Sequence, residues 1–294
     1  MDLQFNQPKT FKELIDMISM FISKHFKKLF LIIICLAGPL LILQYIFLFL
    51  SKKPFIANMM GSDDMRLKIL ETLSYPVMEG RFEFYARIVG YSIFIVIPFV
   101  FIATILALSH RTKNGEFTVG SVIKDSLTAY SYIISGSFGF FILAIIAYFF
   151  PTIVIEPAVT SIIKALPTWG APLSYALVIG IYVIFFFVFM RIVFFVPNAY
   201  EGDLPGYRES WYLTRNKLVR TMAFAIILLG IFLVFQKMLE SISIFLVGDS
   251  ILLIMIMDAY YLISLLFFAV SYAFVYMDLE TIQRLKRRAI IENA

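Results

Sequence analysis

A carboxylate inside an apolar stretch is the residue of this chain best suited to chemistry. Asp258 lies in the apolar run 251–277. An ionised carboxylate inside a bilayer needs a partner, a proton or water, and this need marks many ion and proton pathways. Arg87 and Lys237 fall near the same predicted membrane level and are its candidate partners. The alternative is that Asp258 caps the start of a shorter last helix at the membrane surface.

Arg191 is the second ionisable residue within an apolar run, about two turns before the end of the run 173–197. A long Arg side chain at such a position reaches the lipid headgroups or bonds to the loop that follows. Pro197 is expected to end this helix. The acidic candidates for a partner in the following segment are Glu201, Asp203 and Glu209. These features predict a structural role for Arg191.

Residues that usually hold metals or act as nucleophiles are sparse and scattered. His25 and His110 are far apart in sequence, and no Cys or acidic spacing around them matches a metal site. The single cysteine, Cys35, lies within an apolar run. No glycine-rich phosphate loop and no Ser-His-Asp set is present. The sequence therefore predicts no catalytic residue, no metal and no cofactor. An enzyme acting on lipids would need acidic or His residues gathered at one membrane face.

The elements that must position these residues are six apolar runs. Hydrophobic residues make up 61% of the 294 residues and charged residues only 15%. Each run approaches or exceeds the roughly 20 residues that a helix needs to cross a bilayer. The runs predict an all-α, polytopic membrane protein, with the whole chain 1–294 as one membrane domain. The predicted spans are about 29–50, 86–109, 132–150, 173–197, 218–236 and 251–277.

The distribution of basic residues orients these spans. With both termini in the cytoplasm, the inner segments carry about twice as many Lys and Arg residues as the outer ones, as the positive-inside rule requires. The net charge of +5 therefore reflects topology. No basic cluster is interleaved with aromatic residues on a soluble face, so nucleic acid is not an expected partner. The lipid bilayer is the expected partner.

Amphipathic stretches precede every second span. Thr10 and Glu13 form a capping-box pattern that predicts a helix of about four turns before the first span. This helix is expected either in the lipid interface or packed against the cytoplasmic ends of its own spans. Similar stretches, 117–130 and 203–216, precede spans three and five and share Gly, Leu and Thr at matching offsets, namely Gly120 with Leu127 and Thr128, and Gly206 with Leu213 and Thr214. The pattern predicts three hairpins, each preceded by an amphipathic cytoplasmic helix.

The segment 191–222, RIVFFVPNAYEGDLPGYRESWYLTRNKLVRTM, carries a family resemblance. It resembles bacterial six-span membrane proteins related to the membrane domain found beside some glycerophosphodiester phosphodiesterases. The matching residues are Arg191, Pro197, Gly206, Glu209, Ser210, Trp211, Leu213 and Arg220, with Tyr276 and Asp278 near the end of the last span. Glu280 stands where the family tends to have Arg. The resemblance implies a six-helix protein of the bacterial inner membrane. It implies no phosphodiesterase activity, because the chain has no room for that catalytic domain.

Two functional hypotheses follow. The leading one is a non-enzymatic scaffold or accessory subunit of a membrane complex, whose cytoplasmic surface helices contact other membrane proteins. Trp211, Tyr207 and Tyr212 are its candidate contact residues. The alternative is a small transporter or lipid-handling protein that uses Asp258 and the helix kinks expected at Pro39 and Pro98.

Overall fold

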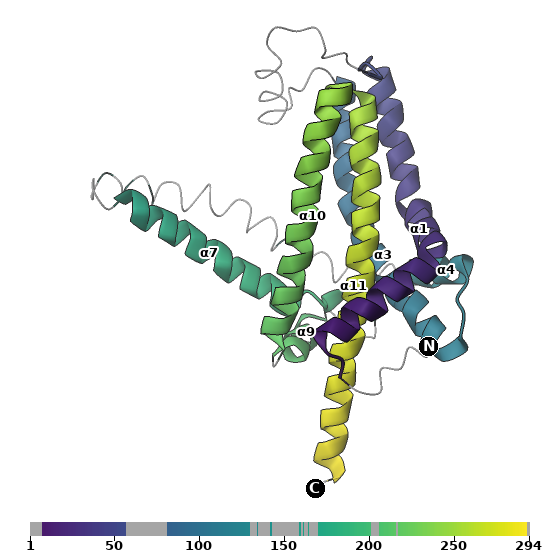
Figure 1. Ribbon diagram of the computed structural model, residues 1–294, viewed down its shortest axis with the longest axis vertical. Helices are drawn as coiled ribbons and strands as arrows, with labels where there is room; N and C mark the ends of the chain where they lie inside the picture. Colours follow the sequence, from purple (N-terminus) through teal and green to yellow (C-terminus); the bar gives the residue numbers. More distant parts are fainter. Residues whose placement is uncertain are drawn as a thin grey trace. The chain divides into compact units, whose positions relative to one another are not determined.

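The protein is all-helical in the part of the chain that the structure describes. The computed structural model describes residues 8–56, 81–129, 170–200, 206–215 and 217–292, with a few isolated positions between 130 and 169. Every element in these ranges is a helix (Figure 1). The described residues divide into two compact units, one from Met1–Leu127 and Ala223–Thr281, the other from Thr128–Met222 and Ile282–Ala294. Each unit is described by itself.

Four helices are long and apolar enough to cross a membrane. They are Phe11–Leu50, Pro172–Asn198, Leu218–Val247 and Ile251–Gln283. They match the first, fourth, fifth and sixth predicted spans and have the character expected of a membrane protein.

The other two predicted spans have different outcomes. The predicted span 86–109 falls on helix α3 (Arg81–Asn114), in which a shorter apolar stretch, Val96–Thr112, is found. The predicted span 132–150 lies outside the described residues. The arrangement as six spans in three hairpins therefore stays a prediction.

Helix α1 (Phe11–Leu50) joins the predicted N-terminal surface helix and the first span into one element. The prediction of two separate helices is wrong. Lys24, Lys27 and Lys28 interrupt the apolar run, but lysine has a high helix propensity, so the helix continues through them. The capping box is confirmed. Thr10 Oγ1 accepts from the Glu13 backbone N–H at 3.3 Å, and Glu13 Oε2 accepts from the Thr10 backbone N–H at 2.6 Å.

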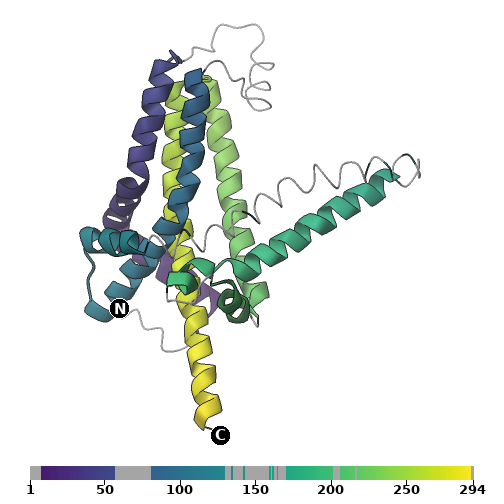
Figure 2. The ribbon, with the colours of Figure 1, turned by 180° about the vertical axis from the view of Figure 1, so that it is seen from behind.

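The first unit contains α1, α3, α10 (Leu218–Val247) from Ala223 onward, and α11 (Ile251–Glu292) as far as Thr281. These helices lie side by side in Figures 1 and 2. Leu48 of α1, Ala86 of α3 and Ile251 of α11 are buried together at one end, which we call the Leu50 end. Because Leu48 is near the end of α1 while Ala86 is near the start of α3, these two helices are antiparallel.

The N-terminal part of α1 packs across the opposite end of the same unit. The Phe11 ring lies 5.5 Å from the ring of Phe224 on α10, and the Phe21 ring lies 5.5 Å from that of Phe274 on α11. Figure 1 shows this dark purple segment crossing α11 while the rest of α1 runs alongside it. Of the two interpretations of the N-terminal helix, these contacts favour packing against the ends of the long helices.

Two short helices occur at the other predicted surface stretches. They are α4 (Val119–Thr128) in the first unit, whose last residue alone falls in the second, and α9 (Tyr207–Thr214) in the second unit. The sequence match between them does not hold in detail. Gly206 precedes α9 with φ 78°, a left-handed conformation that favours glycine, whereas Gly120 lies inside α4. The glycine with positive φ before α4 is Gly115. The aligned glycines therefore have different structural roles.

Candidate functional site

Asp258 is held by a tyrosine on the first helix. The Tyr45 hydroxyl of α1 donates a hydrogen bond to Asp258 Oδ2 of α11 at 3.0 Å. The suggestion that Asp258 caps the last helix is wrong, because α11 begins at Ile251, about two turns earlier. Ser250 supplies the cap instead, and its Oγ accepts from the Leu253 N–H at 3.2 Å. Asp258 thus joins two long helices within the unit.

The two basic residues suggested as partners of Asp258 are placed differently. Lys237 pairs with Glu240 on its own helix, with 2.8 Å between Lys237 Nζ and Glu240 Oε2. Arg87 is half-buried on α3. The hydrogen bond that the structure gives Asp258 comes from a neutral group, the Tyr45 hydroxyl.

Gln44 is a polar residue of this unit that sequence reasoning missed. Its side chain is 8% exposed, and its Oε1 is buried with no hydrogen-bond partner among the described residues. Gly90 of α3 lies against it, since a Cβ added at Gly90 would meet the Gln44 amide at 3.4 Å. The signal in the sequence was a single amide within the first apolar run.

The residues of the family motif on α11 lie at the opposite end of the unit from Leu50. Tyr276 and Asp278 are each 2% exposed. Asp278 Oδ1 accepts a hydrogen bond from the Lys9 backbone N–H at 2.7 Å, just before α1 begins. The predicted last span ends at Met277, and the helix that contains it continues to Glu292.

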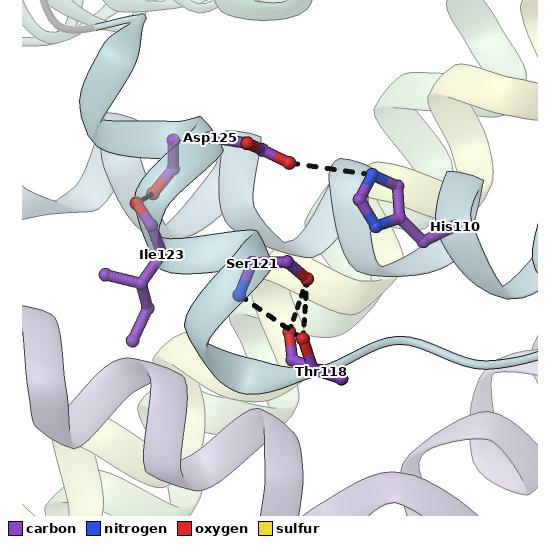
Figure 3. Close-up of polar contacts among 6 residues, drawn as sticks. His110, Thr118, Ser121, Ile123 and Asp125 are labelled. Carbon is purple, nitrogen blue, oxygen red and sulfur yellow. Dashed lines mark hydrogen bonds and ion pairs between the residues drawn. The ribbon is translucent and has the colours of Figure 1, made fainter.

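The two histidines are in separate surroundings. His25 packs against two aromatic rings, 5.0 Å from that of Phe21 and 5.3 Å from that of Phe117. His110 of α3 faces Asp125 of α4, with 3.8 Å between Nε2 and Oδ2 (Figure 3). In the described ranges, no group of three or more His, Cys, Asp or Glu side chains is placed to hold a metal ion.

In the second unit, Arg191 and Ser210 meet where a long helix breaks. Helix α7 (Gly170–Ile192) ends one residue after Arg191, and a short helix, α8 (Phe195–Tyr200), follows. The Ser210 hydroxyl donates to the Arg191 carbonyl oxygen at 2.9 Å and accepts from the Phe194 N–H at 3.0 Å. Helix ends leave such backbone groups without intrahelical partners. Ser210 therefore closes the break from a helix that follows in sequence.

Pro197 is not the residue at which α7 ends. It lies in the first turn of α8. A proline is tolerated there because the first N–H groups of a helix have no intrahelical acceptor. The remaining residues of the motif surround this junction. Thr214 Oγ1 lies 3.3 Å from the Arg191 carbonyl oxygen, and the Tyr207 ring lies 5.3 Å from that of Phe195.

Three further motif residues lie on or after α9. Leu213 is buried at 8% exposure, while Glu209 and, on α10, Arg220 are half-buried. Glu201 and Asp203, the other suggested partners of Arg191, lie outside the described residues. The structure thus brings Arg191, Ser210 and Trp211 together, whereas Asp258 and Arg191 belong to different units.

Comparison with protein-family models, curated proteins and solved structures finds no match for this chain. The resemblance to the bacterial six-span family therefore stays a prediction that rests on the residues of its motif.

Proposed function

We propose that this chain is a non-enzymatic scaffold or accessory subunit of a membrane complex. The observation that carries the proposal is the bonding of two acidic residues of the last helix, Asp258 and Asp278. The Asp258 carboxylate bonds to Tyr45 of another helix, and Asp278 bonds to the backbone before α1. Both acids join parts of the chain that are far apart in sequence. This arrangement favours a framework over a reactive centre.

The contact surface of the proposed scaffold is α9. Trp211 and Tyr212 are 41% and 51% exposed there, and Arg208 lies over the Tyr212 ring at 5.9 Å. Tyr, Trp and Arg are the residues most enriched at the centres of protein interfaces. In the proposed topology, both termini and α9 lie on the cytoplasmic side of a bacterial inner membrane, as the distribution of Lys and Arg indicates.

A photo-crosslinking amino acid at position 212 tests this surface in native membranes. Ile184 of α7, which is 64% exposed on an apolar helix, is the matched control position. We expect one discrete protein adduct from position 212 and lipid adducts from position 184. The partner should also remain with the chain at fixed stoichiometry in mild detergent. A monodisperse lone protein, with no protein adduct from position 212, would contradict the proposal.

The alternative function, a small transporter or lipid-handling protein, is favoured by one observation. Asp258 is a carboxylate with a neutral partner, and the Gln44 amide oxygen is buried one residue before that partner, Tyr45. Proton flux or substrate uptake in proteoliposomes should fall with Asp258→Asn if this group carries protons. An unchanged rate in every such assay would remove this alternative.

A further inference from the structure

The side chain of Arg191 contacts two aromatic rings. Its guanidinium carbon lies 5.3 Å from the ring centroid of Phe187, one turn earlier on α7, and 5.2 Å from that of Trp211 on α9. Both distances are in the range of cation–π contacts. The backbone of Arg191 is fixed as well, because Ser210 bonds to its carbonyl oxygen. Two helices of the second unit therefore hold this cation in one place.

Two nitrogens of the same side chain have no hydrogen-bond acceptor among the described residues. Its Nε and Nη1 atoms are buried, and neither has a partner in the described part of the chain. Arg keeps its charge at any physiological pH, so it cannot escape this cost by losing a proton. Aromatic faces contribute attraction but accept no strong hydrogen bonds from both nitrogens. Glu209, an acidic residue of α9 two positions before Trp211, forms no ion pair with Arg191.

The position of Arg191 indicates which acceptor is missing. It lies near the C-terminal end of an apolar helix, Pro172–Asn198, that is long enough to cross a membrane. The end of such a helix lies at the depth of lipid headgroups, where phosphate oxygens are abundant. Arg is the side chain whose planar set of donors best matches phosphate. Trp211 and Phe187 are 41% and 38% exposed, so both rings that contact Arg191 reach the protein surface.

We infer that Arg191, Phe187 and Trp211 form a binding site for a phosphate group, supplied by the headgroup of an anionic phospholipid. The guanidinium donates to the phosphate oxygens, and the two rings shield this contact from water. Rotation of the partly exposed Trp211 ring admits the ligand to the buried nitrogens. The site shares Trp211 with the proposed contact surface on α9, but it requires no protein partner, so its test does not depend on the scaffold function.

Native mass spectrometry of the full chain in detergent, titrated with phosphatidylglycerol, tests the site. Arg191→Met removes the charge and keeps an unbranched side chain, and it should weaken binding of the first lipid at least about tenfold. Arg215→Gln is the matched control, because it removes one positive charge from an exposed position directly after α9. It should change the affinity less than about twofold. Equal lipid affinity for Arg191→Met and the unmodified chain would overturn the proposal.

A second measurement needs no substitution and holds even if Arg191→Met fails to fold. Phenylglyoxal modifies accessible arginines, and peptide mass spectrometry reads the rate at each position. Phosphatidylglycerol vesicles should slow modification of Arg191 relative to phosphatidylcholine vesicles and leave the rate at Arg215 unchanged. Millimolar inorganic phosphate that protects Arg191 equally well would assign the site to free phosphate. An Arg191 rate that neither lipid nor phosphate changes would overturn it.

Discussion

The two units treat a charged group near the membrane in opposite ways. In the first unit, the Asp258 carboxylate is matched by a hydroxyl of the same chain, from Tyr45. In the second, the Arg191 side chain contacts two rings and its carbonyl oxygen bonds to Ser210. Two of its side-chain nitrogens have no acceptor among the described residues. A buried polar group that is satisfied within the fold stabilises it, whereas one left open is a candidate for a ligand. The difference separates a structural contact from a binding site.

The largest expected effect comes from the junction that fixes Arg191. Ser210→Val removes the hydroxyl that donates to the Arg191 carbonyl and accepts from the Phe194 N–H, so the break loses two hydrogen bonds and the Arg191 carbonyl keeps only the longer one from Thr214. We expect a loss of about 3 kcal/mol in the free energy of unfolding, measured by denaturation in detergent. Ser23→Ala is the control, since the exposed Ser23 hydroxyl bonds only to a carbonyl of its own helix. A Ser210→Val protein as stable as this control would show that the hydrogen bonds of Ser210 do not stabilise the break between α7 and α8.

Tyr45→Phe probes the satisfied pair of the first unit. It leaves the Asp258 carboxyl without its donor and should destabilise the protein by about 1–2 kcal/mol. Asp258→Asn keeps an acceptor for the Tyr45 hydroxyl and should cost less, about 1 kcal/mol or below. Thermal unfolding of both variants in one detergent gives the order directly. The reverse order would mean that Asp258 is stabilised by something other than Tyr45.

Gly206→Ala tests the entry to α9, the helix that carries Ser210 and Trp211. Gly206 has φ 78°, so an alanine there is strained and should cost about 1 kcal/mol. Gly120→Ala is the matched control, because a Cβ there meets nothing within 4 Å inside α4. It should be neutral or slightly stabilising, by up to about 1 kcal/mol. Equal costs at the two glycines would restore their structural equivalence.

The smallest effect is expected at the Leu50 end of the first unit. Lys53 Nζ and Asp249 Oδ1 are 2.7 Å apart, and the Asp249 side chain is 53% exposed. Asp249→Asn should change stability by less than about 1 kcal/mol, and by still less at high salt. A loss comparable to that of Tyr45→Phe would show that this exposed ion pair stabilises the unit as much as the Tyr45–Asp258 contact does.

Local signals in the sequence predicted local structure well. The capping box at Thr10 depends on residues three positions apart, and it forms as expected. Four of the predicted spans coincide with long apolar helices, because hydropathy over about 20 residues is a strong signal. The break after Arg191 was placed at Pro197, since a proline is visible in the sequence and the turn before α8 is not.

Long-range contacts were beyond the sequence. Charge suggested Arg87 or Lys237 for Asp258, yet a tyrosine supplies the bond, because helix packing and not formal charge decides which side chains meet. The motif around Arg191 and Trp211 named residues that lie close together in the second unit, and it gave no indication of their contacts. That Ser210 serves two backbone groups depends on how α9 packs against the end of α7, which no spacing rule specifies.

The bonds between α1 and α11 have a consequence for synthesis of the chain. Tyr45 and Asp258 are 213 residues apart, and Lys9 and Asp278 are 269 apart. At the Leu50 end, the Ile251 and Leu252 N–H groups donate to the Pro54 and Phe55 carbonyls. Chains emerge from the ribosome N-terminus first, at about 5–20 residues per second. The contacts of α1 with α11 therefore form only after the last helix has been synthesised. A truncated chain would leave the Tyr45 hydroxyl and the Lys9 N–H without these acceptors, which would distinguish it from the complete fold.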